Sequence, residues 1–111
     1  MAGQNNKGVT NGTTDVIVVA SPLGSTSRLI PKGGITIYNN DTVTATVTLQ
    51  FSVTTPTDTV LEQAEILPNG TYINSMPIVL DGTDESVQIY LAGTVTTNEL
   101  DWFTHYRDEA Q

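Results

Sequence analysis

The chain has 111 residues and no cysteine, so it is long enough for one domain and cannot use disulfides, thiol catalysis or thiolate metal sites. Its 12 acidic and 4 basic residues leave a formal charge of -8, and the basic residues are scattered. Nucleic-acid binding needs a basic patch, and anionic membranes repel such a chain, so neither partner is expected. With no signal-like apolar start and no apolar run that spans a bilayer, we expect synthesis in the cytoplasm unless a leader has been removed.

The start of the chain is almost entirely Gly, Asn, Gln and Thr. Such a segment has few groups to bury, so residues 1–14 are expected to form a flexible N-terminal arm, with residues 15–111 as the folded domain. The arm is either a disordered end or a segment that becomes ordered on a neighbouring subunit.

The next two segments predict short strands. Residues 15–20 form a continuous β-branched run, which is typical of a strand covered on both faces. Residues 25–30 can form a short strand, and residues 31–34 (Pro-Lys-Gly-Gly) are expected to form a turn.

The clearest strand pattern lies between residues 35 and 53. Every odd position from Val43 to Val53 is apolar and every even position is polar, which places the apolar side chains on one face of a strand. Residues 35–38 alternate in the same way, and Asn39–Asp41 supplies a turn. We therefore expect a hairpin whose apolar face needs a partner sheet.

The segment from Thr59 to Leu67 fits a helix or a strand, and its neighbours favour a strand. The Asn69-Gly70 dipeptide that follows is typical of a hairpin turn. Residues 72–80 predict a broken strand, because Met76-Pro77 belongs at a sheet edge or a kink.

Two further segments complete the strand pattern. Residues 86–92 alternate cleanly, and residues 94–97 and 100–107 form the last strand or strand pair. With about seven or eight short strands separated by turn signals, the chain is predicted to be all-β, as a single antiparallel β-sandwich or a jelly-roll-like barrel.

No group of residues predicts catalysis, so the chain is expected not to be an enzyme. The only histidine, His105, lies in an aromatic strand, and no serine lies in a Gly-x-Ser-x-Gly elbow. The turn residues Asp81, Asp84 and Glu85 could hold a calcium ion but lack EF-hand spacing. No metal ion and no cofactor is therefore predicted.

The candidate interaction residues lie at the two ends of the chain. The segment 100–107 holds the only Trp together with Phe, His, Tyr and Arg, and both faces of a strand there would carry large groups. These aromatic residues either close the core or contact another subunit. The candidate interface residues are Gln4, Asn5, Asn6, Lys7, Val9, Trp102, Phe103, His105, Tyr106 and Arg107.

Several segments together resemble small virion proteins of tailed bacteriophages. They are the Gly/Asn-rich start, Ile35–Asp41 with the Thr-alternating strand, the turn Leu67–Gly70, the stretch Pro77–Gly82, and a last strand that ends in His105-Tyr106. The resemblance is greatest to the decoration (cement) proteins of capsid shells. It implies a homo-oligomer, with a trimer favoured, that is made in the host cytoplasm and binds the major capsid protein on the virion. The family offers no catalytic residues.

The leading hypothesis is therefore a non-enzymatic structural protein that binds and stabilises a capsid shell through several weak contacts made together. One alternative is a module that binds carbohydrate or a cell surface through the rings of Trp102, Tyr38, Tyr72 and Tyr90. Another is a different virion part, such as a head–tail connector or a tail component.

Overall fold

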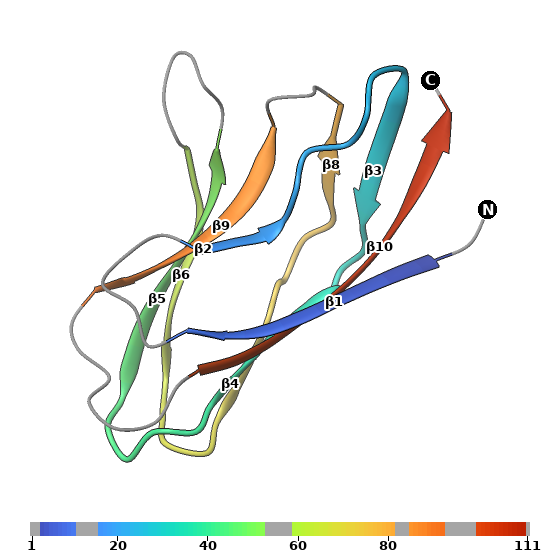
Figure 1. Ribbon diagram of the computed structural model, residues 1–111. Coiled ribbons are helices and arrows are strands. Elements are labelled where there is room, and N and C mark those ends of the chain that lie inside the picture. Colours follow the sequence, from blue (N-terminus) through green and yellow to red (C-terminus); the bar gives the residue numbers. More distant parts are fainter. Residues whose placement is uncertain (1–2, 11–15, 53–58, 82–84, 93–99, 111) are drawn as a thin grey trace.

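A computed structural model of the chain describes residues 3–10, 16–52, 59–81, 85–92 and 100–110 (Figure 1). Within these ranges the protein is all-β and antiparallel, as predicted, with ten strands. The strands are β1 (Gly3–Thr10), β2 (Val16–Val19), β3 (Thr26–Ile30), β4 (Ile35–Asn39), β5 (Ala45–Ser52), β6 (Thr59–Ile66), β7 (Thr71–Ile73), β8 (Ile78–Leu80), β9 (Ser86–Ala92) and β10 (Leu100–Ala110). None of the described residues belongs to a helix that could cross a membrane.

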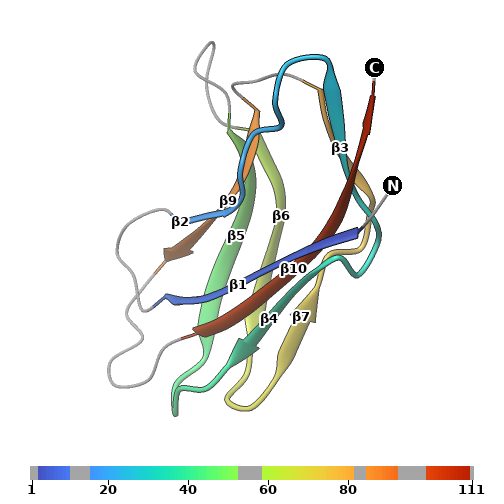
Figure 2. The same cartoon turned by 45° about the vertical axis from the view of Figure 1, so that its right-hand side comes forward.

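The strands form two sheets that enclose one core. Sheet B has the order β2-β9-β5-β6. Sheet A is built on β10, which pairs with β1 along one edge and with β3 and β4 along the other. Figures 1 and 2 both show β1 lying along β10, which joins the two ends of the sequence in one sheet.

Sheet A contains two interrupted strands. The first consists of β3 and β4, which both run antiparallel to β10. A turn at Pro31–Gly34 separates them, and in it Gly34 N–H donates a hydrogen bond to Pro31 O at 2.8 Å. Their outer neighbours are β8 and β7, separated by residues 74–77, so the predicted break in the segment 72–80 is confirmed. Counted with each interrupted strand as one, each sheet has four strands, in agreement with the predicted seven or eight.

The side chain of Asn74 repairs the break in the edge strand. It is 1% exposed, and its Oδ1 accepts a hydrogen bond from Ile35 N–H at 2.8 Å. Its Nδ2 donates to Pro31 O at 3.1 Å and to Met76 O at 2.8 Å. These bonds replace ladder bonds that the irregular backbone cannot make, so buried main-chain groups stay paired.

The predicted hairpin between residues 35–38 and 43–53 is wrong. The two segments are β4 in sheet A and β5 in sheet B, so the turn Asn39–Asp41 crosses from one sheet to the other. Each strand has one apolar side, and placing them in opposite sheets buries those sides between the sheets. Asn39, fully buried, holds the crossing by donating from Nδ2 to Val43 O and Ile66 O, both at 2.8 Å.

The segment from Thr59 to Leu67 forms a strand as favoured, but the hairpin predicted after it is also wrong. The turn at Asn69-Gly70 connects β6 of sheet B to β7 of sheet A. Asn69 has a φ of 63°, and Gly70 N–H donates to Leu67 O at 2.7 Å, so the turn itself is present. The turn residues thus reverse the chain without pairing the strands on either side.

The prediction of a flexible arm over residues 1–14 is wrong for the central part of that segment. Residues Gly3–Thr10 form β1 and pair with β10 over the whole strand, whereas residues 1–2 and 11–14 lie outside the described residues. A ladder uses main-chain groups that Gly, Asn and Gln supply as well as any apolar residue, which explains why composition alone pointed to an arm.

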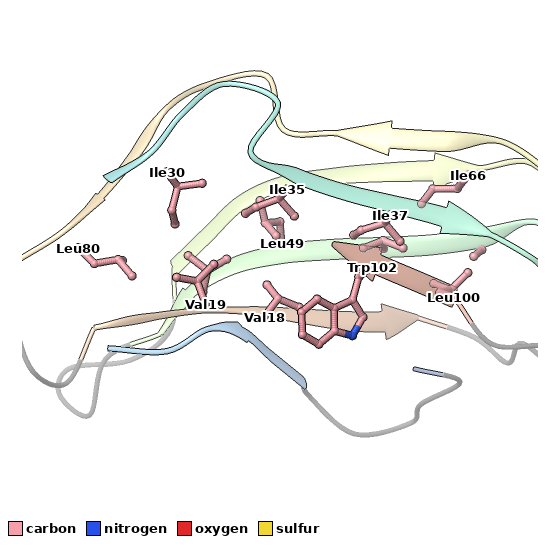
Figure 3. Close-up of a cluster of buried hydrophobic side chains, with 13 residues drawn as sticks. Val18, Val19, Ile30, Ile35, Ile37, Leu49, Ile66, Leu80, Leu100 and Trp102 are labelled. Carbon is pink, nitrogen blue, oxygen red and sulfur yellow. The ribbon is translucent and has the colours of Figure 1, made fainter. Parts of the chain in front are cut away.

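The core lies between the sheets and includes Trp102, which is 8% exposed (Figure 3). Its buried members are Val18, Val19, Ile30, Ile35, Ile37, Ala45, Val47, Leu49, Ile66, Leu80, Val87, Leu100 and Trp102. Within the described part of the chain, Trp102 Nε1 has no hydrogen-bond partner, so packing holds this ring in place.

Candidate interaction surface

The candidate residues from the two ends of the chain lie on the paired strands β1 and β10. Asn5 lies opposite His105, Lys7 opposite Phe103, and Gln4 opposite Tyr106. The ring nitrogen Nδ1 of His105 is 2.8 Å from Asn5 Oδ1. The two groups chosen separately from the sequence therefore form one two-stranded ribbon.

The ribbon divides the candidates between two faces. Asn5, Lys7, Val9, Phe103, His105 and Arg107 are exposed. Trp102 belongs to the core, and Tyr106 is half-buried and packs against it, while Asn6 is exposed although it lies opposite the buried Thr104. Of the two interpretations of the aromatic strand, core closure therefore applies to Trp102, and of its Trp, Phe and Tyr residues only Phe103 is exposed.

The outer face of sheet A carries exposed apolar side chains from several strands. Val9 is 53% exposed, Ile73 is 52%, Val79 is 49% and Phe103 is 44%. Strand register places the outward side chains in rows: Val9 beside Asp101 and Tyr38, Lys7 beside Phe103, Thr36 and Ile73, and Arg107 beside Leu29 and Val79. We call Val9, Leu29, Tyr38, Ile73, Val79 and Phe103 the apolar face.

The outer face of sheet B is polar by comparison. On β5 and β6 its polar side chains are Thr46, Thr48, Gln50, Ser52, Gln63 and Glu65, and the one apolar exception in these register pairs is Val60, which lies opposite Gln50. They bond among themselves, since Gln63 Nε2 donates to Thr48 Oγ1 at 3.1 Å. A polar face of this kind is stable in water, whereas exposed apolar residues gathered on one sheet are typical of an interaction surface.

Two open hollows mark the apolar face. One, of about 490 Å³, is lined by Lys7, Val9, Tyr38, Asp101 and Phe103, among others. The second, of about 510 Å³, includes Leu29, Pro31, Pro77, Val79 and Arg107 in its lining. Each combines apolar walls with a basic side chain, so each can receive an apolar group that has a polar or acidic neighbour.

The basic residues are distributed unequally over the molecule. Lys7 and Arg107 are exposed on the outer side of sheet A, and Lys32 is exposed in the turn between β3 and β4. The fourth, Arg28, is turned towards Asp108. Arg107 Nη2 lies 3.2 Å from Glu109 Oε1, but both side chains are about half exposed, so this pair contributes little to stability. The outer side of sheet A, which holds the apolar face, therefore carries exposed basic as well as acidic side chains, although the protein as a whole is strongly acidic.

Tyr106 takes part in a structural cluster around Arg28. Arg28 Nε and Nη2 donate to the Asp108 carboxylate at 2.8 and 3.0 Å, and Nη1 donates to Ala20 O at 2.8 Å. The guanidinium lies 4.5 Å from the centre of the Tyr106 ring. The hydrogen bond to Asp108 raises the pKa of Arg28, so this cluster stays charged and ties β3, β10 and the end of β2 together.

A second cluster joins the sheets at their other edge. Glu62 on β6 accepts hydrogen bonds from Tyr72 OH at 2.5 Å and from Ser75 Oγ at 2.7 Å. These bonds lower the pKa of the Glu62 carboxyl, and the bond from Tyr72 has the larger effect. Burial and the bond to Glu62 raise the pKa of Tyr72. The bond to Glu62 therefore gives Tyr72 a structural role.

The described residues contain no group of three or more Asp, Glu, His or Cys that could hold a metal ion. Of the calcium candidates, Asp84 lies outside the described residues; Asp81 accepts a hydrogen bond from Ser27 Oγ at 2.6 Å, and Glu85 Oε1 accepts one from Asp81 N–H. These hydrogen bonds give Asp81 and Glu85 structural partners within the protein.

Sequence reasoning missed Leu29, Ile73 and Val79 as surface residues. A signal was present, because Leu29-Ile30, Tyr72-Ile73 and Ile78-Val79-Leu80 are consecutive large apolar residues, which place one on each face of a strand. Comparisons with protein-family models, with curated proteins and with solved structures found no match for the chain.

Proposed function

We propose that the protein is a non-enzymatic virion structural protein that binds and stabilises a phage capsid shell as an oligomer, with the apolar face against its partner. One observation carries the proposal: the outer side of sheet A gathers several exposed apolar residues, whereas the outer side of sheet B along β5 and β6 is mostly polar, with Val60 as an exposed apolar residue. The resemblance of the sequence to decoration proteins supplies the partner, the major capsid protein.

The mechanism is steric and multivalent. Covering one large apolar side chain contributes roughly 1.5–3 kcal/mol at most, so one subunit offers a modest contact. An oligomer, favoured as a trimer, presents several copies of the face, and each bound copy raises the effective concentration of the next. The net charge of -8 keeps free copies in solution.

Single substitutions on the apolar face test the proposal. Phe103→Ser and Val79→Ser remove exposed apolar groups outside the core, so folding stability should change little while the affinity for capsids falls about tenfold or more. Val60→Ser is the matched control, because Val60 is 58% exposed but lies on β6 of sheet B. Co-sedimentation with purified capsids measures occupancy, and wild-type occupancy by both face variants would contradict the proposal.

Carbohydrate binding is the second candidate, and the hollow beside Tyr38 and Phe103 is the feature that favours it. Two of the other proposed sugar platforms are in structural use, since Trp102 is buried and Tyr72 bonds to Glu62; the Tyr90 side chain lies outside the described part. A glycan panel read by thermal shift tests this candidate, and a flat response would count against it.

A different virion position, such as a head–tail connector or tail component, would use the same surface in another symmetry. Light scattering of the purified protein over a dilution series separates these cases. A stable trimer supports shell decoration, and a ring of higher order supports a connector or tail part.

A further inference from the structure

The main chain, more than the side chains, attaches β1 to the domain. All eight of its residues pair with β10, and among the described strands β10 is its only ladder partner. Asn5, Asn6, Lys7 and Val9 are exposed, and none of the β1 residues whose side chains the structure describes belongs to the core. A strand held in this way opens at a lower free energy than the strands that carry the core.

The place that β1 occupies on β10 is costly to leave empty. Gly8 lies against the Trp102 ring, where an added Cβ would be 2.6 Å from Cζ2. If β1 left, it would expose this ring and a row of unpaired main-chain groups on β10. An empty place would therefore be refilled by any strand that fits.

The place is also selective for the sequence of β1. A strand that fits needs Gly opposite Trp102, because no side chain has room there, and it gains a polar contact when Asn lies opposite His105. β2, which follows β1 along the chain, lies in the other sheet and pairs with β9, so among the described strands the transfer of β1 breaks no other ladder. The β1 of a second copy satisfies each requirement by identity.

We propose that β1 is an exchangeable strand, and that copies of the protein associate by placing β1 of one copy along β10 of another. Exchange of an identical element needs no new interface, which makes it a low-cost route to an oligomer. The inference rests on the oligomeric part of the proposed function, but it does not depend on capsid binding.

Disulfide trapping between copies tests the exchange in the full chain, which has no native cysteine. Lys7 and Phe103 are opposite each other, and both are exposed. His105 N–H donates to Gly34 O at 2.7 Å on the far side of β10, so alternate residues of β10, including Phe103, form non-hydrogen-bonded pairs with β1. Such pairs have the close side chains that a disulfide needs.

Lys7→Cys and Phe103→Cys single variants are mixed in equal amounts, unfolded, refolded together and oxidised. Mass spectrometry then quantifies the peptide pair that joins position 7 to position 103. If every β1 has exchanged at random, about a quarter of the places hold a matched pair of cysteines. Lys7→Cys mixed with Thr46→Cys, on the outer side of sheet B, measures links from chance collisions. Asn5→Cys with His105→Cys is a second pair, in case one variant does not fold.

A yield of matched links well above the collision control supports exchange. The proposal is overturned if both matched mixtures give only the control yield while the double variant Lys7→Cys/Phe103→Cys closes its disulfide within one chain. Because no capsid is present, this outcome is independent of the co-sedimentation result: strand exchange can fail while capsid binding holds, and the reverse.

Discussion

Replacing Gly8 with alanine measures directly how closely β1 lies against the core. An added Cβ would be 2.6 Å from Cζ2 and 2.8 Å from Cε2 of Trp102, inside the limit of 3.0 Å below which atoms must move. The ring is 8% exposed and is surrounded by core residues, so it cannot turn away cheaply. Either the ring or β1 must shift.

The expected loss follows from two opposing effects. Overpacking a well-packed core costs about 1–3 kcal/mol. Replacing glycine by alanine in a compatible backbone recovers about 0.4–1 kcal/mol, because the unfolded chain becomes less flexible. The net loss for Gly8→Ala is therefore about 1–2 kcal/mol, or roughly 5–10 °C in Tm for a domain of this size.

Gly3→Ala is the matched control on the same strand. Its added Cβ would lie 2.9 Å from Cε1 of His105, but that atom is the end of an exposed side chain that can rotate. We expect a change within about 0.5 kcal/mol for this variant. Urea unfolding followed by the fluorescence of Trp102, the only tryptophan, measures both. Equal stability of the two variants would refute the close packing of β1 on Trp102.

Three further predictions concern the side-chain clusters and the aromatic strand. The pKa of Glu62 is lowered in the folded state, so its bonds stabilise the protein above the ordinary value of 4.5 and this contribution is lost as the pH falls through the lower folded value. Urea midpoints between neutral pH and about pH 3 should fall less for Glu62→Gln, and an unchanged acid slope would contradict this. Arg28→Lys loses the two-point contact with Asp108 and should cost about 1–2 kcal/mol, and a double-mutant cycle with Asp108→Asn that gave additive losses would disprove the coupling. Trp102→Ala should cost about 3–5 kcal/mol, whereas Phe103→Ala, one residue on, should cost under about 1 kcal/mol; similar losses would show that the two faces are misassigned.

The faces of the strands could be predicted from the sequence because side chains alternate along a strand. In β10, Leu100, Trp102 and Thr104 are buried while Phe103 and His105 are exposed, as the alternation indicates. The break in the edge strand could also be predicted from the local sequence, because Pro77 has no N–H group to donate to a ladder.

The candidate residues at the two ends of the chain could be chosen from the sequence, but their arrangement could not. The pairing of Asn5 with His105 joins residues far apart in the chain through main-chain groups that are the same in every residue. No local pattern specifies such a partner. For the same reason the apolar face, which adds Ile73 and Val79 from other strands, became visible only when strand register placed them together.

The sequence by itself determined most strand segments other than β1, which of their sides are apolar and where the chain turns, since these depend on neighbouring residues. Only the tertiary structure decided whether a turn joins paired strands or crosses between sheets. At Asn39–Asp41 and Asn69-Gly70 the chain crosses, because β4 and β5 bury their apolar sides against each other, as do β6 and β7 at the edge. That choice depends on burial across the whole core, a property that no turn sequence contains.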